Sequence, residues 1–302
     1  MTGTKENRRP ARILLVGGTG FIGRRVAAAL AAQGVTPRLF DLAPAIDRMT
    51  LPPGYEAVAG DVTDADSLAA AAGGCDGIVH LAGLMTMDCA RDPVRAVRVN
   101  VLGSLLVFDL AARMGVPVGY LGTAGVFGPD SAAVPHPMTL YGVSKLAVEG
   151  VARVWAADHG VPSLGLRPYI VYGPGISSGI AAGPSVALAA SVRREPAAIR
   201  FSGRVGFVHV DDVARMLAAA MTRPMAGATV LTMAGDTRDM ADFTAELARQ
   251  SGWNGITVED PPLRIPADLA SDPVPDWLGP QPVTRIEAGI HATLAELRGQ
   301  LS

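Results

Sequence analysis

Along the first half of the chain, short runs of consecutive apolar residues alternate with longer stretches in which apolar side chains recur about every three to four positions. The short runs are typical of buried strands, and the longer stretches are typical of helices with one buried face. The predicted strands cover residues 12–16, 36–40, 56–59, 77–81, 117–121 and 163–166. The predicted helices cover residues 21–33, 64–72, 93–114 and 139–159. Such alternation predicts right-handed βαβ units, and therefore an α/β fold with a doubly wound parallel sheet of the Rossmann type.

After about residue 170 the pattern becomes less regular. Helices are predicted over residues 185–194, 211–222 and 240–251, with short strands over 207–210 and 229–232. A proline-rich stretch, 261–282, precedes a last helix over 284–297. We therefore expect a flexible N-terminal tail over 1–10 and a Rossmann domain over 11–170. Residues 171–302 are expected to form mainly a small C-terminal subdomain, with some segments returning to the sheet.

Composition narrows the class of protein. The chain has 302 residues, of which 49% are hydrophobic and 18% charged, as in folded globular proteins. With a formal net charge of −2, the chain lacks the excess of positive charge that is typical of nucleic-acid-binding proteins. No apolar run approaches the ~18 residues of a membrane span, and the first ten residues lack the apolar core of a signal peptide. Two cysteines cannot form a disulfide framework, so we expect a cytoplasmic location. From the net charge and the apolar runs, we expect a protein that binds neither nucleic acid nor membrane.

A glycine-rich segment joins the first predicted strand to the first predicted helix. Its spacing, through Gly17, Gly20 and Gly23, lets the backbone turn sharply and approach a pyrophosphate, while the helix N-terminus offers free N–H donors. We expect Gly17, Gly20, Phe21, Ile22 and Gly23 to bind a dinucleotide. The alternative is a glycine-rich turn without a ligand.

An acidic residue at the end of the second strand supports the dinucleotide. Asp41 follows Gly23 by 18 residues, close to the spacing of about 20 that places a carboxylate on the adenosine ribose. A carboxylate there accepts hydrogen bonds from both ribose hydroxyls and repels a 2′-phosphate, so NAD is favoured over NADP. Asp61 ends the third strand, where an acid can meet the adenine amino group. Capping of a turn or helix is the alternative for both residues.

A tyrosine and a lysine lie four residues apart on one face of the predicted helix 139–159. Tyr141 would take the proton of a substrate hydroxyl, and the Lys145 charge would help to lower the tyrosine pKa from its ordinary value near ~10. Thr123 follows the fifth strand, at the edge where open α/β sheets bind ligands, and its hydroxyl could hold the substrate oxygen. The alternative is an ordinary amphipathic pair.

In the order and spacing of these motifs the chain resembles the extended short-chain dehydrogenases/reductases, the NAD-dependent epimerase/dehydratase family. The resemblance rests on Gly17, Gly20, Gly23, Asp41, Asp61, Val62, His80, Leu81, Ala82, Gly83, Asn100, Thr123, Tyr141, Lys145, Arg167, Pro168 and the segments 171–175 and 209–214. It implies NAD as cofactor, with contacts from Val62, Leu81, Ala82, Gly83, Asn100, Tyr141, Lys145, Pro168, Ile170 and Val171. It also implies a substrate-binding role for the C-terminal subdomain and a homodimer formed through the helices 93–114 and 139–159.

Departures from the family pattern bear on the reaction. The residues after Thr123 are Ala124 and Gly125, without the acidic pair typical of dehydratases. Nucleotide-sugar epimerases usually carry an asparagine where this chain has Ile170, and an Arg-Asp pair at the positions of Val205 and Gly206. We therefore favour hydride transfer between NAD and a small hydroxylated or carbonyl substrate, such as a sugar acid or polyol.

Several alternatives and minor assignments remain. A nucleotide-sugar epimerase is the second hypothesis, and a non-catalytic NAD-binding sensor is the third. Met85, Thr123, Ala124 and Arg204 are the candidate substrate contacts. The five histidines do not have the spacing of a metal site, so a structural role is expected for each.

Overall fold

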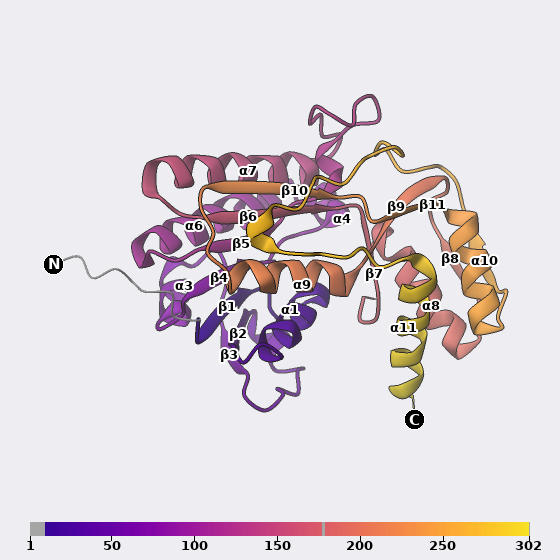
Figure 1. Ribbon diagram of the computed structural model, residues 1–302, viewed down its shortest axis with the longest axis horizontal. Coiled ribbons are helices and arrows are strands. Elements are labelled where there is room, and N and C mark those ends of the chain that lie inside the picture. The colour runs from indigo at the N-terminus through magenta and orange to yellow at the C-terminus, as the bar shows by residue number, and fades with distance from the viewer. Residues whose placement is uncertain (1–9, 177–178, 302) are drawn as a thin grey trace.

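The computed structural model describes residues 10–176 and 179–301. Residues 1–9 of the tail expected over 1–10 lie outside the described part of the chain. Figure 1 shows a central sheet with helices on both faces and a separate group of helices and short strands beyond one end of it.

The main sheet has seven strands, all paired in parallel, in the order β3-β2-β1-β4-β5-β6-β10. Its strands are β1 (Arg12–Val16), β2 (Thr36–Asp41), β3 (Glu56–Ala59), β4 (Gly77–His80), β5 (Val118–Leu121), β6 (Ser163–Pro168) and β10 (Ala228–Met233). The predicted α/β class and doubly wound parallel sheet are thus confirmed. The strand order reverses at β1, which has β2 on one side and β4 on the other, and ligands bind at such a switch point.

Helices cover both faces of this sheet (Figure 1). One face carries α1 (Phe21–Ala31) and α9 (Val210–Met221), and the other carries α3 (Ala65–Ala72), α6 (Gly103–Met114) and α7 (Leu140–His159). Alternate side chains of β1 serve the two cores: Leu15 packs with the α1 and α9 side, and Leu14 packs with the α6 and α7 side. The continuous apolar runs of the sequence therefore reflect burial on both faces.

The helix expected over 93–114 is interrupted. It consists of α5 (Pro93–Val97), a π-helical turn η1 (Arg98–Leu102) and α6. Within the turn, the Asn100 carbonyl accepts a hydrogen bond from Ser104 Oγ at 2.6 Å, and Ser104 Oγ lies 2.8 Å from Nε2 of His80 on β4. A side chain thus competes for a helical carbonyl, and π-turns often mark functional sites. The short helices α2 (Ala43–Ile46) and α4 (Thr86–Arg91) were not predicted.

The C-terminal part contributes two segments to the main sheet: β10 forms its edge, and α9 packs against α1. The other segments form a three-stranded sheet and a two-stranded sheet, with three helices beside them. These elements are β7 (Ile170–Tyr172), β8 (Ala197–Ile199), β9 (Arg204–His209), β11 (Asp236–Asp239), β12 (Ile256–Val258), α8 (Gly183–Arg193), α10 (Met240–Ser251) and α11 (Ile286–Gly299).

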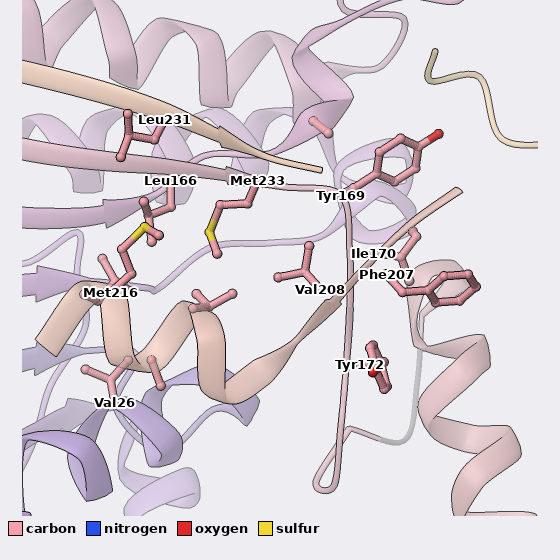
Figure 2. Packing of buried hydrophobic residues seen from close by; sticks show 14 of the residues in the cluster. Val26, Leu166, Tyr169, Ile170, Tyr172, Phe207, Val208, Met216, Leu231 and Met233 are labelled. Atoms are coloured by element: carbon pink, nitrogen blue, oxygen red, sulfur yellow. The ribbon is translucent and has the colours of Figure 1, made fainter. Parts of the chain in front are cut away.

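An apolar core joins the C-terminal elements to the sheet. Figure 2 follows it from Val26, between α1 and α9, and Met216, which points from α9 toward Leu166 on the sheet, past Met233 to Tyr172 and Phe207. Phe207 also stacks on Phe243 of α10, with ring centroids 4.8 Å apart. Because this core is shared, the C-terminal elements are held firmly at the end of the sheet where the strands finish. None of the described helices is long and apolar enough to cross a membrane.

Candidate cofactor and active site

The glycine-rich turn lies between β1 and α1. Gly17 has a φ of +82°, and a Cβ built there would lie 2.5 Å from the backbone nitrogen of Ala82. A Cβ on Gly23 would lie 2.6 Å from the carbonyl oxygen of Gly17. Larger residues are therefore excluded at both positions. Gly20 caps α1 without a side-chain hydrogen bond, so the first N–H groups of the helix are free to bind an anion.

A cavity of about 270 Å³ opens beside this turn, across the switch point of the sheet. Of the residues expected to bind the cofactor, it is lined by Gly17, Gly20, Asp41, Asp61, Val62, Leu81, Ala82 and Gly83. The sequence prediction missed its remaining lining residues, Val16, Phe40, Leu42, Gly60, Leu84, Arg95 and Val99. Most of these are chain neighbours of predicted residues, as Val99 is of Asn100, but Arg95 comes from α5, before the π-turn. Its approach to the cavity left no signal in the sequence.

The two acidic residues of the cavity are held by local hydrogen bonds. Asp41 Oδ2 accepts from the Thr19 hydroxyl at 2.6 Å, and Asp41 Oδ1 accepts from the Leu42 backbone N–H at 2.9 Å. Thr19, in the glycine-rich turn, therefore orients the carboxylate expected to face the ribose. Asp61 Oδ1 accepts from the Thr63 backbone and hydroxyl at 2.9 and 2.8 Å. Both acids thus hold local turns at the cavity wall, and their expected contacts with the cofactor stay predictions.

Tyr141 and Lys145 lie together in the first turns of α7, beyond the inner end of the cavity. Both side chains are buried, and Lys145 Nζ is 5.9 Å from the centroid of the Tyr141 ring. A Cβ built on Gly83, which lines the cavity, would lie 3.5 Å from Lys145 Nζ. The pair therefore lies directly next to the cavity, although neither residue is among its lining.

Burial sets the protonation of this pair. It lowers the pKa of Lys145 from 10.5 to about 8, against a small opposing effect of the Cys89 thiol. It raises the pKa of Tyr141 above its ordinary value of 10, and Cys89 acts in the same direction. Burial thus favours the uncharged form of both side chains in the protein without its cofactor, and the expected lowering of the tyrosine pKa by the Lys145 charge stays a prediction for the protein with NAD bound.

Asn100 connects the cavity wall to α7. Its Oδ1 accepts from the Leu84 backbone N–H at 2.7 Å, and its Nδ2 donates to the Leu84 carbonyl at 2.9 Å and to Ser144 Oγ at 3.2 Å. The side chain expected near the cofactor is thus engaged with protein groups. It fixes the position of the segment after Gly83 relative to α7.

His80 supports the same region from β4. Its ring is buried, burial lowers its pKa to about 3, and the Lys145 charge acts in the same direction. Because Ser104 donates its hydroxyl proton to the Asn100 carbonyl, His80 Nε2 must donate to Ser104. His80 is therefore a neutral structural residue, as expected.

The remaining candidate substrate contacts lie on several different elements. Thr123 accepts a hydrogen bond from the Gly125 backbone at 3.0 Å, and its hydroxyl proton can be donated elsewhere. Ala124 is buried, whereas the Met85 side chain is 47% exposed at the start of α4. Arg204 begins β9 opposite Asp239 and is exposed. Arg204 lies three residues before Phe207, which pairs with Ile170 of β7 in the three-stranded sheet.

The other predicted cofactor contacts lie at the edges of this region. Phe21 and Ile22 begin α1, and Pro168 ends β6. Ile170 is buried in β7, and Val171 is half-buried there. In the described ranges 10–176 and 179–301, no group of His, Cys, Asp or Glu side chains is arranged to hold a metal ion.

The fold and the cavity together define a dinucleotide-binding α/β protein with a buried tyrosine–lysine pair. The family model for the NAD dependent epimerase/dehydratase family matches residues 13–233. The chain belongs to this family, and its cofactor is NAD, for which the glycine-rich turn, Asp41 and the adjoining cavity provide a fitting site.

Curated relatives include both epimerases and reductases. The chain is 31% identical to a UDP-glucose 4-epimerase from Azospirillum brasilense over 180 residues, 56% of this chain and 52% of the relative. It is 27% identical to a GDP-6-deoxy-D-mannose reductase from Pseudomonas aeruginosa over 258 residues, 79% of this chain and 80% of the relative. The match therefore spans about half the length of the first relative and most of the second.

Solved structures share the whole fold. The UDP-glucose 4-epimerase from Thermotoga maritima, solved with UDP-glucose, has a TM-score of 0.84 at 23% identity, covering 96% of this chain and all of that one. The UDP-glucose 4-epimerase from Thermus thermophilus, solved with NAD, has a TM-score of 0.80 at 24% identity, covering 95% and 99%. At this identity the similarity establishes the fold alone.

Proposed function

We propose that the protein is an oxidoreductase that transfers hydride between NAD and the hydroxyl-bearing or carbonyl carbon of a small substrate. The observation that carries the proposal is the burial of Tyr141 and Lys145 together beside the cavity that Gly83 lines. NAD supplies the hydride acceptor or donor. Tyr141 accepts the hydroxyl proton during oxidation and returns it to the carbonyl oxygen during reduction, so atoms and charge balance.

Three residues share the work around the reacting carbon. Tyr141 holds the moving proton, and the Lys145 ammonium favours its phenolate form electrostatically. Thr123 donates its hydroxyl proton to the substrate oxygen and so orients it. Burial raises the pKa of Tyr141, so the phenol is protonated near neutral pH and holds the proton that carbonyl reduction requires.

The test is the Tyr141→Phe variant, assayed through the absorbance of reduced cofactor with a panel of hydroxyl and carbonyl compounds. We expect kcat to fall roughly 100- to 10,000-fold while NAD binding is retained. Tyr55→Phe, at a half-buried tyrosine just before β3, is the matched control and should retain full activity. Undiminished turnover in Tyr141→Phe would refute the mechanism.

A nucleotide-sugar epimerase is the second candidate, because the first relative is such an enzyme. Three positions argue against it. Ile170 and Val205 are buried in the apolar core, and a Cβ on Gly206 would lie 1.9 Å from the Ala234 carbonyl oxygen. The polar side chains that epimerases use at these positions therefore have no equivalent here. NAD that stays bound through extensive dialysis would favour the epimerase, whereas freely exchanging NAD would favour the dehydrogenase.

We also infer a homodimer formed through the helices 93–114 and 139–159. On α7, Val143, Ala147, Gly150 and Val154 follow the spacing i, i+4, i+7, i+11, and Val143 and Val154 are 48% and 44% exposed. Leu102, on the neighbouring helix, is also exposed. Such a stripe of small and apolar residues suits close packing against a second pair of helices.

A further inference from the structure

Three separate segments approach the first turns of α7, a fourth follows the end of β6, which packs against the same helix, and none of the four contains a charged residue. They are residues 81–87, 123–127, 131–138 and 168–176. In a chain with 18% charged residues, the absence of Asp, Glu, Lys and Arg from all four is a property of the site and not of the overall composition.

Specific contacts bring these segments to α7. Gly83 adjoins Lys145 Nζ, and Leu84 packs with Tyr141 in one apolar cluster. A Cβ built on Gly142 would lie 2.4 Å from the Gly125 carbonyl oxygen and 2.9 Å from Pro137 Cβ. Three of the segments thus contact Tyr141 itself, the adjacent Gly142 or Lys145 one turn later.

The fourth segment is connected through an ion pair. Arg167, immediately before Pro168, donates to Glu149 Oε1 at 2.7 Å, and Glu149 lies one helical turn after Lys145. Both charges of the pair are used within the protein, since the two side chains are largely buried against each other. The pair therefore fixes segment 168–176 beside α7 without offering a charge to a ligand.

Apolar side chains are exposed where these segments reach the surface. Met85 and Met87 lie at the start of α4, which packs against α7, and Met138 lies three residues before Tyr141. Together with Val134 they are 43–65% exposed. The nearest acid on α4, Asp88, is paired with Arg91 at 2.9 Å. A free diphosphate or carboxylate would find no counter-charge among these groups, whereas flexible methionines accommodate alkyl groups of varied shape.

We infer that the substrate is an uncharged alcohol or ketone that carries an apolar group next to the reacting carbon. This inference rests on the proposed hydride transfer and narrows its substrate class away from sugar acids. The alkyl group lies against Met85 and Met138, and the oxygen lies between Thr123 and Tyr141. Two cations adjoin the segments, but Lys145 is buried beside Tyr141 and Arg24 donates to the Gly175 carbonyl oxygen at 3.0 Å. Because the segments themselves carry no cation, loss of hydration of a carboxylate in these surroundings would oppose its binding.

The experiment compares two matched series on the enzyme with NAD or NADH: 2-alkanones of six to twelve carbons, and 2-oxo acids of the same chain lengths. Binding is measured by calorimetry and turnover by absorbance, so that each is read independently. We expect the affinity for the neutral ketones to rise roughly three- to fourfold for each added methylene, until the alkyl chain extends beyond the exposed apolar side chains. We also expect kcat/KM to favour the neutral ketone over its acid by roughly tenfold or more.

Two variants introduce a lysine at an exposed apolar position, one beside the proposed substrate site and one distant from it. Met138→Lys should lower the preference for the neutral ketone by about tenfold, and Leu301→Lys, at an exposed apolar position near the C-terminus, should leave it unchanged. Turnover that is fastest with a 2-oxo acid or a UDP-sugar would overturn the substrate class and leave hydride transfer intact. Chain-length-dependent binding without any turnover would support the substrate class and refute hydride transfer. If neither series binds, the inference is wrong.

Discussion

The cost of burying the charged Lys145 side chain can be tested through the stability of the folded protein, without a substrate. Replacing this residue with methionine removes the ammonium and keeps a flexible side chain of similar length. Lys145 is buried in the described structure, and its pKa is lowered from 10.5 to about 8 by loss of hydration. We therefore expect Lys145→Met to be more stable than the natural protein at pH 7, at the expense of activity.

The magnitude and its pH dependence follow from the two pKa values. The difference between 10.5 and about 8, at ~1.4 kcal/mol for each pKa unit, corresponds to about 3 kcal/mol of unfolding free energy. Below pH 8 the lysine is charged in both states, so the folded protein bears the full cost. Between about pH 8 and 10.5 the unfolded chain holds more protons, so the stability of the natural protein rises with pH. The advantage of Lys145→Met should therefore shrink to near zero by pH 10.5.

The assay is urea unfolding of both proteins without NAD, at pH values from 7 to 10. Comparing the two at each pH cancels the titration of the other groups. Arg153→Met removes an exposed cation from the same helix and serves as control, with a change below about 1 kcal/mol at every pH. The reasoning is refuted if Lys145→Met is no more stable at pH 7, or if its advantage does not change with pH.

Three further changes test other parts of the molecule. Glu149→Gln leaves the largely buried Arg167 guanidinium without its ion-pair partner and should lower the unfolding free energy, measured in urea, by about 3 kcal/mol. Glu195→Gln, which breaks the exposed ion pair with Arg193, is the control and should lower it by less than about 1 kcal/mol. Asp41→Ser should weaken NAD binding and reduce its preference over NADP by roughly tenfold or more in competition titrations; an NADP preference in the natural protein would show that Asp41 was misassigned. Val154→Glu should convert a dimer to a monomer in light-scattering measurements, while Val258→Glu on β12 should not.

The main sheet could be predicted because most of its strands contain buried apolar runs between turn signals, although β3 has no fully buried residue. Strand 12–16, for example, was predicted with both of its observed limits. The strands β7, β8, β11 and β12 have only three or four residues each and were missed. Their conformation depends on pairing with distant segments, as β8 pairs with β12, and local sequence carries little information about such contacts.

The candidate site was predictable to the extent that its residues are close in sequence or follow a characteristic spacing. The glycine-rich turn, Asp41 and the tyrosine–lysine pair fall in this group. The π-turn at 98–102 does not, because it depends on Ser104 and on His80 from another strand. For the same reason Arg95 could not be assigned to the cavity wall.

The raised pKa of Tyr141 in the protein without NAD and the inference about the substrate have one physical cause. Spacing shows that Tyr141 and Lys145 share a helix face, but it does not show the medium in which their charges interact. That medium is formed by uncharged segments far apart in sequence, which remove water from both side chains and so disfavour the ammonium and the phenolate alike. The same medium disfavours a charged substrate. A site that lowers the pKa of its own lysine to about 8 should therefore select a neutral reactant, and the two properties should change together in Met138→Lys.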